Sequence, residues 1–187
     1  RQINWNRLYQ VNYLSNMEGK GARYIIEDRR NDQQQIVFNS GLKYKYNDHT
    51  TLTGGIQYNQ YKGKHFKTIE DLLGADYWLD VDQFAERDFS GDTLKPQNDL
   101  DNPNRKVVEE DIFGYNYNIH RQLAQAWIQG EFTYDDIDFY AGASYTGQQF
   151  YREGLMRNGR HPENSAGESE KQTFHDLALK KIGRAHV

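Results

Sequence analysis

The sequence contains no cysteine and only three prolines, and it has no long hydrophobic run. Without cysteine, disulfides and thiolate metal sites are excluded, and cysteine usage gives no indication of the redox compartment. No apolar run approaches the roughly 20 residues of a transmembrane helix, so a helical membrane protein is excluded. Hydrophobic residues make up 36% of the 187 residues and the mean hydropathy is -1.00, which is low for a soluble domain with a large core.

An excess of basic residues is also missing. The net charge is -4, with acidic and basic residues mixed along the chain, so a nucleic-acid partner is not expected. In contrast, 14 Tyr, 9 Phe and 3 Trp are present, and this aromatic content argues against a disordered chain. A transmembrane β-barrel remains compatible with the low hydropathy, because only one face of each of its strands must be apolar.

Residues 123–150 contain two runs that alternate between apolar and polar side chains. In the first run Ala124, Ala126 and Ile128 share one parity, and polar residues such as Gln125 and Gln129 share the other. Two aspartates, at 135 and 136, separate this run from a second one of the same kind. Because successive side chains of a strand point to opposite faces, the pattern predicts a β-hairpin with one apolar and one polar face.

Residues 36–61 repeat this pattern around a short turn at residues 47–49, which predicts a second hairpin. Residues 171–180 predict a further strand with a weaker pattern. The connections between these hairpins, residues 63–114 and 152–170, are long, and loops of this length are rare in soluble domains unless they have a function. Short turns at one end of the strands and long loops at the other are typical of outer-membrane barrels.

Short helices are expected outside the strands. Thr68 is a candidate N-cap for a helix over residues 69–73, and residues 80–89 could form one or two helical turns. Apolar residues near the start of the chain have helical spacing. They are Ile3, Leu8, Val11 and Leu14. We expect all three segments to be folded parts of extracellular loops.

Aromatic residues gather near the two ends of the predicted strands, with Tyr44, Tyr46, Phe132 and Tyr134 near the short turns and Tyr58, Tyr61, Tyr145 and Tyr151 near the long loops. Tyr and Trp prefer the headgroup region of a membrane, because the ring is apolar and its tip is polar. The apolar residues between the two groups share the same parity. We therefore expect this face to contact lipid, with Ile56, Ile128, Phe139 and Ala141 pointing outward.

Several long motifs resemble the barrel of TonB-dependent receptors, in particular the nutrient-uptake receptors with a carboxypeptidase-like regulatory domain. They lie at residues 23–32, 71–89, 97–105, 113–120 and 152–167. The resemblance implies an all-β fold, an antiparallel up-and-down transmembrane β-barrel in the outer membrane of a Gram-negative bacterium. Residues 1–181 would supply four to five of its 22 strands, with long, partly helical extracellular loops.

The same resemblance implies TonB-dependent import of a bulky polar ligand, a glycan or a peptide, and no enzymatic activity. The implied partners are outer-membrane lipid, the rest of the barrel with its plug domain, the TonB complex, and a surface lipoprotein lid. The plug and the TonB contact would lie outside this sequence. Residues 182–187 can be back-translated to a sequence that resembles a sequencing-library adapter, so we expect them to be a non-native tail; the alternative is an ordinary basic tail.

The long insertion holds the residues that best suit a binding site. Aromatic faces beside carboxylates and amides fit polar ligands, and the candidates are Tyr77, Trp78, Asp80, Asp82, Phe84 and Arg105. The alternative is that these aromatic residues form the loop's own small core. The acidic stretch from Asp76 to Asp88 lacks the spacing of an EF-hand loop, so a solvated loop is the simpler interpretation and no metal is expected.

No catalytic motif is complete. Ser144 lies in a run that approaches G-x-S-x-G, but Thr146 occupies the position of the second glycine and the serine falls within a predicted strand. No cofactor-binding motif occurs either. The alternative function is a soluble secreted β-rich module that binds carbohydrate. Such a module would bury the apolar face of its strands.

Overall fold

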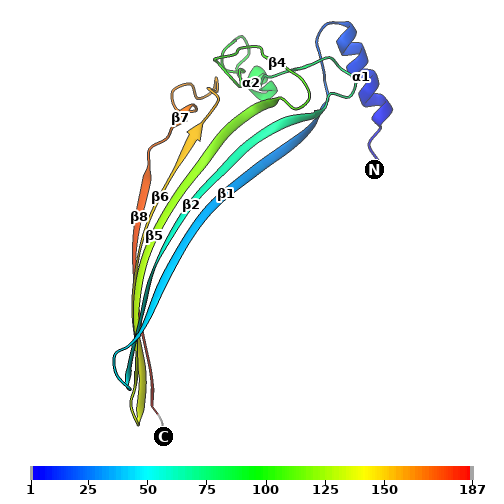
Figure 1. Cartoon of the computed structure of the whole chain (residues 1–187). Coiled ribbons are helices and arrows are strands. Elements are labelled where there is room, and N and C mark those ends of the chain that lie inside the picture. Colours follow the sequence, from blue (N-terminus) through cyan, green and yellow to red (C-terminus); the bar gives the residue numbers. More distant parts are fainter. Residues whose placement is uncertain (1, 186–187) are drawn as a thin grey trace. The chain divides into compact units, whose positions relative to one another are not determined.

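The computed structural model describes residues 2–185, which form mainly antiparallel β-structure (Figure 1). The helices are α1 (Trp5–Met17) and α2 (Gln83–Asp88). The strands are β1 (Ile26–Lys45), β2 (Thr50–Asp71), β3 (Trp78–Leu79), β4 (Lys106–Val107), β5 (Ile112–Thr133), β6 (Ile137–Gly154), β7 (Gly167–Glu168) and β8 (Gln172–Ala185). The predicted all-β, up-and-down sheet is confirmed.

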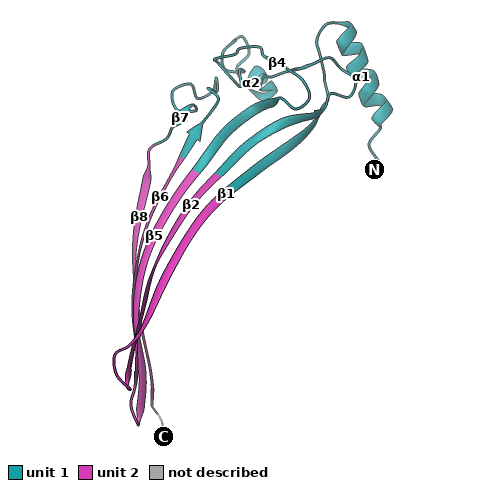
Figure 2. Ribbon diagram, in the orientation of Figure 1, with its two compact units in different colours: residues 1–33, 63–119, 152–169 teal, residues 34–62, 120–151, 170–187 magenta. Residues whose placement is uncertain are grey.

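The main sheet has the strand order β1-β2-β5-β6, and both β7 and β8 pair with β6. β3 and β4 form a separate two-stranded ladder. Contacts divide the chain into two compact units, coloured in Figure 2. We call residues 1–33, 63–119 and 152–169 the loop unit, and residues 34–62, 120–151 and 170–187 the strand unit.

Both predicted hairpin turns belong to the strand unit. The Tyr46 N–H donates to the Thr50 carbonyl at 3.0 Å, and Tyr134 and Ile137 exchange backbone hydrogen bonds of 2.9 and 3.3 Å around the two aspartates. The turns lie side by side, because the Thr133 N–H donates to the His49 carbonyl at 2.8 Å. The His49 ring also stacks on Tyr134 with centroids 5.3 Å apart.

On the inner strands of the strand unit the apolar face is the more exposed one, whereas the described side chains of β8, and those of β1 within this unit, are exposed on both faces. Ile128 is 58% exposed and Leu179 is 77% exposed, and Ile56 on β2 is exposed as well. Of the residues expected to point outward, Ala141 is also exposed, whereas Phe139 is partly buried because it stacks on Phe132 at 4.3 Å. Polar residues on the opposite face bond with one another, as in the hydrogen bond from Gln125 to Thr146.

The prediction of a helix after Thr68 is wrong. Residues 68–71 continue strand β2, and this segment pairs with the residues just before β5. The Ile69 N–H donates to the Asp111 carbonyl at 3.2 Å, and the Glu110 N–H donates to the Ile69 carbonyl at 2.8 Å. These long-range bonds suit β-branched Thr68 and Ile69, and they override the local helical pattern. The first long loop therefore spans residues 72–111 rather than 63–114.

The other expected elements are present. α1 contains Leu8, Val11 and Leu14 of the predicted N-terminal helix, whereas Ile3 precedes it, and α2 lies within residues 80–89. The strand expected at residues 171–180 is longer, because β8 continues to Ala185 and pairs Ile182 with Tyr140. The tail expected at residues 182–187 thus falls partly in β8, and His186 and Val187 lie outside the described residues. No helix in residues 2–185 has the length and apolar character needed to span a membrane.

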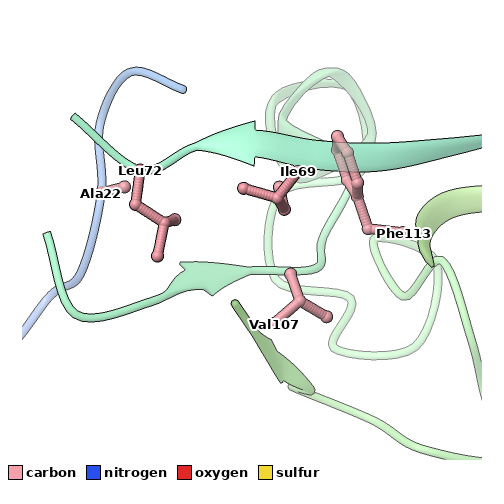
Figure 3. Close-up of a cluster of buried hydrophobic side chains, with 5 residues drawn as sticks. All are labelled: Ala22, Ile69, Leu72, Val107 and Phe113. Carbon is pink, nitrogen blue, oxygen red and sulfur yellow. The ribbon is translucent and has the colours of Figure 1, made fainter. Parts of the chain in front are cut away.

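The loop unit has its own hydrophobic core, shown in Figure 3. Its members come from four separate segments of the chain and are Ala22, Ile69, Leu72, Val107 and Phe113. Trp78 packs against this cluster from β3. Each fully buried aliphatic or aromatic side chain contributes roughly 1.5–3 kcal/mol of transfer free energy, so this cluster holds β2, β4 and the start of β5 together.

Candidate ligand-binding site

A cavity of about 440 Å³ opens in the loop unit beside this core. It is lined by residues of β1, β2, β3 and β5 and of both long loops. The lining side chains that carry its chemistry are Glu27, Lys67, Trp78, Asp82, Phe84, Asn98, Phe113, Tyr115 and Asn158. Aromatic faces, amides and charged groups therefore share one cavity of a size that suits a small polar ligand.

Three of the six candidate residues line this cavity: Trp78, Asp82 and Phe84. Trp78 also contacts the hydrophobic core, so it belongs both to the cavity wall and to the packing of the loop. Trp78 thus fits the interpretation as part of a loop core, and its place in the cavity wall leaves it able to contact a ligand. Phe84 is mainly exposed, and the Arg87 guanidinium lies 5.6 Å from its ring centroid.

Asp82 lines the cavity because it caps α2. Its Oδ1 accepts hydrogen bonds from the N–H groups of Phe84 and Ala85, at 2.9 and 3.2 Å. Aspartate is among the preferred N-cap residues, since its carboxylate satisfies N–H groups that have no partner within the helix. The other oxygen, Oδ2, lies 3.6 Å from the Arg160 guanidinium of the second long loop. The cap fixes the carboxylate at the cavity wall.

Asp80 and Arg105 lie behind the wall instead of lining the cavity. The buried Asp80 carboxylate accepts hydrogen bonds from Arg105 at 2.7 Å and from the Asn98 side chain at 2.8 Å. It also accepts the Gly114 N–H at 2.9 Å. Asn98 and Gly114 both line the cavity, so this ion pair positions the wall from the protein side.

Tyr77 faces away from the cavity lining, toward the connection between α1 and β1. Its hydroxyl donates to the Gly19 carbonyl at 2.7 Å, and the Lys106 ammonium lies 4.2 Å from its ring centroid. Gly21 packs so closely that a Cβ there would come within 2.7 Å of the ring, and its φ is +70°. Tyr77 therefore clamps this connection to the loop unit.

Glu27 and Lys67 are cavity residues that sequence reasoning missed. The Lys67 ammonium donates to Glu27 at 3.0 Å and lies 4.4 Å from the Phe113 ring centroid and 5.7 Å from that of Tyr115. Burial by itself would raise the pKa of Glu27, but hydrogen bonds from Lys67 and Arg29 outweigh it and hold this pKa below its ordinary value. The partners are 40 residues apart in sequence, and no local signal connects them.

The second long loop is fastened to the first by main-chain and side-chain bonds. The Leu100 N–H donates to the Arg157 carbonyl at 2.7 Å, and the Gly159 N–H donates to the Gln97 carbonyl at 2.8 Å. Arg157 also donates to Asp101 at 2.9 Å. These bonds bring Asn158 to the cavity formed by the first loop.

The acidic stretch does not form a metal cluster. Within residues 2–185, no three His, Asp or Glu side chains are grouped so that they could hold a metal ion. Asp80 faces Arg105, and Asp82 caps α2, so both carboxylates are engaged by protein donors. The cavity thus offers binding chemistry, namely aromatic faces, amides and two carboxylates.

The comparisons with known proteins give no family for this chain. No protein-family model matches it, and a search of curated proteins likewise finds no match.

Proposed function

We propose that this chain is a segment of an outer-membrane receptor barrel whose long loops bind a bulky polar ligand for uptake. The observation that carries the proposal is the exposed apolar face of the strand unit, opposite a face of bonded polar groups. Soluble monomers rarely expose large contiguous apolar patches, and such patches mark contact with a membrane or a partner. Strands that alternate between lipid-facing apolar and lumen-facing polar residues are the pattern of outer-membrane barrels.

Aromatic residues support the same orientation. Tyr58 and Tyr145 are exposed on the apolar face, about halfway along β2 and β6 and on the side of Ile128 that is remote from the hairpin turns. At the hairpin ends of the strands Tyr44 and Tyr134 are exposed near the turns. Two aromatic groups of this kind correspond to the girdles of transmembrane barrels, in which each ring lies at the headgroup level.

The edges of the main sheet also favour a larger barrel. β1 has a neighbour on one side only in the strand order of the described residues, and β8 pairs only with β6. Open strand edges are not tolerated in lipid, because their N–H and C=O groups lack partners there. In the proposal these edges pair with further barrel strands. The family resemblance further implies a plug, contact with the TonB complex and a lipoprotein lid. These partners are part of the proposal.

Lipid contact can be tested residue by residue in the complete receptor that the proposal implies. We would place a single cysteine at Ile128 or at Gln129, label it with a small fluorophore and reconstitute the protein in vesicles that contain brominated lipid. Bromine quenches only fluorophores in contact with the acyl chains. We expect strong quenching at Ile128 and little at its neighbour Gln129, which faces the polar side.

Equal quenching at the two positions would contradict the lipid-facing assignment. The competing function, a soluble carbohydrate-binding module, predicts that neither label is quenched and that the protein does not associate with vesicles. The two labels differ by one residue, so depth and strand position are nearly matched.

A further inference from the structure

The side chains that line the cavity of the loop unit carry unbalanced charges. Its lining contains two carboxylates, Glu27 and Asp82, and one ammonium group, Lys67. Lys67 is already hydrogen-bonded to Glu27 at 3.0 Å. Asp82 keeps one oxygen, Oδ2, that takes no part in capping α2, and the Arg160 guanidinium is 3.6 Å away, beyond good hydrogen-bond distance. The lining thus has one more negative than positive charge.

One wall of the cavity already holds a cation. The Lys67 ammonium is placed between the Glu27 carboxylate and the Phe113 ring, and the Tyr115 ring is also within reach. A cation gains electrostatic attraction from the face of an aromatic ring and a stronger, charge-assisted hydrogen bond from a carboxylate. This arrangement shows which chemistry the cavity can accommodate.

A second part of the lining also combines a carboxylate with aromatic rings, but it has no lysine. Asp82, Trp78 and Phe84 supply a carboxylate and two aromatic rings. Arg87 lies over the Phe84 ring at 5.6 Å, and neither Arg87 nor Arg160 is among the lining residues. Asn98 and Asn158 add amide groups that can orient a polar ligand.

We propose that this cavity binds a cationic side chain or amino terminus of a peptide, an ammonium or guanidinium group that pairs with Asp82 beside Trp78 and Phe84. The inference rests on the proposed receptor function and narrows its ligand from glycan or peptide to a basic peptide. A neutral glycan would use the aromatic faces and amides, but it would leave the Oδ2 of Asp82 with only the 3.6 Å ion pair to Arg160.

The test uses two probes that differ by one charged group, Nα-dansyl-lysine amide and Nα-dansyl-norleucine amide, titrated by dansyl fluorescence onto the complete receptor in detergent micelles. The lysine probe should bind at least about tenfold more tightly, because a hydrogen bond to a charged group contributes roughly 1.5–3 kcal/mol. Equal affinity for the two probes would overturn the proposal, as would a neutral trisaccharide that binds more tightly than the lysine probe.

The matched variants are Asp82→Asn and Asp48→Asn. Asparagine caps a helix as well as aspartate does, so Asp82→Asn removes the charge while it preserves the N-cap of α2. It should lower the affinity for the lysine probe about tenfold and leave the affinity for the norleucine probe unchanged. Asp48 is exposed, pairs with Lys45 in the strand unit and lies outside the cavity lining, so its change should have no effect on either probe. Loss of both probes in both variants would also contradict the proposal.

This outcome is independent of membrane insertion. If brominated lipid quenches the label at position 128 but the receptor binds the lysine and norleucine probes equally, the receptor function stands and the proposal of a basic-peptide ligand is wrong. If the label is not quenched and the lysine probe still binds through Asp82, the cavity assignment stands and the membrane assignment is wrong.

Discussion

The carboxylate of Asp80 is completely buried and lies 2.7 Å from the guanidinium of Arg105, which keeps about a third of its surface exposed (0% and 32%). Asp80→Ala should destabilise the loop unit by about 3 kcal/mol, the lower end of the range for a broken buried ion pair, because Arg105 can still reach water. The local measurement is hydrogen exchange at the Gly114 amide, which donates to Asp80 and should lose its protection.

An exposed pair of the same residue types serves as the control. Asp101 and Arg157 are 60% and 44% exposed, so Asp101→Ala should change the stability by less than about 1 kcal/mol. Similar losses in the two variants would mean that Asp80 is no more than a surface ion pair.

Gly55 should not tolerate a side chain. A Cβ there would lie 2.6 Å from the Ser40 carbonyl oxygen and 3.0 Å from the indole of Trp127. Because one of these neighbours is backbone, Gly55→Ala should cost roughly 1–3 kcal/mol through overpacking. Gly147→Ala is the matched change in β6, since the nearest atom to its Cβ would be 3.6 Å away in His175. The measurement is the midpoint of denaturant unfolding for each variant. Equal midpoints for Gly55→Ala and Gly147→Ala would contradict the close packing at Gly55.

The lipid-facing assignment predicts an asymmetry between neighbouring residues. In the complete receptor refolded in bilayers, Ile128→Arg should cost about 2–4 kcal/mol of unfolding free energy, because a charge on the lipid face loses its hydration. Gln129→Arg should cost much less. Ala126→Leu separates lipid from a packed protein core: lipid accepts the added volume, whereas a close-packed core would lose roughly 1–3 kcal/mol. A large loss for Ala126→Leu would rule out lipid contact.

The Glu27–Lys67 pair should make the stability of the loop unit depend on pH. Interactions with Lys67 and Arg29 hold the pKa of Glu27 below its ordinary value of 4.5 despite its burial. A lowered pKa means that the pair contributes stability above pH 4.5 and that this contribution is lost as the pH falls through the folded value. Unfolding midpoints of the wild type and of Glu27→Gln should therefore differ at neutral pH and converge in acid. A difference that stays constant with pH would exclude this linkage.

The strand unit could be predicted from the sequence because its pattern is local. The alternation around Ala126 and Ile128 needs no knowledge of a partner, and two aspartates between two alternating runs already indicate a hairpin turn. The cap of α2 is equally local, since Asp82 directly precedes the helix that it caps. Each of these features depends only on residues within a few positions of it in the sequence.

The loop unit could not be predicted in the same way. The local pattern predicts a helix that begins at Thr68, but the segment pairs with residues more than 40 positions further along the chain. Sequence reasoning predicts a ligand contact for Asp80, but this residue is buried against partners 18, 25 and 34 residues away in the sequence. Glu27 was missed because its partner, Lys67, lies on another strand. Each of these outcomes depends on which distant segments meet.

The division of the cavity wall among separate stretches of chain has a consequence for recombination. Residues around positions 25–27, 67, 78–84, 98, 113–115 and 158 meet there, and hydrogen bonds such as that from Gly159 to Gln97 join stretches that a single crossover would separate. A graft of residues 72–111 alone into another scaffold would leave those donors and acceptors facing foreign partners. New binding preferences would therefore arise more readily by point substitution within the wall, or by transfer of residues 25–169 as one cassette.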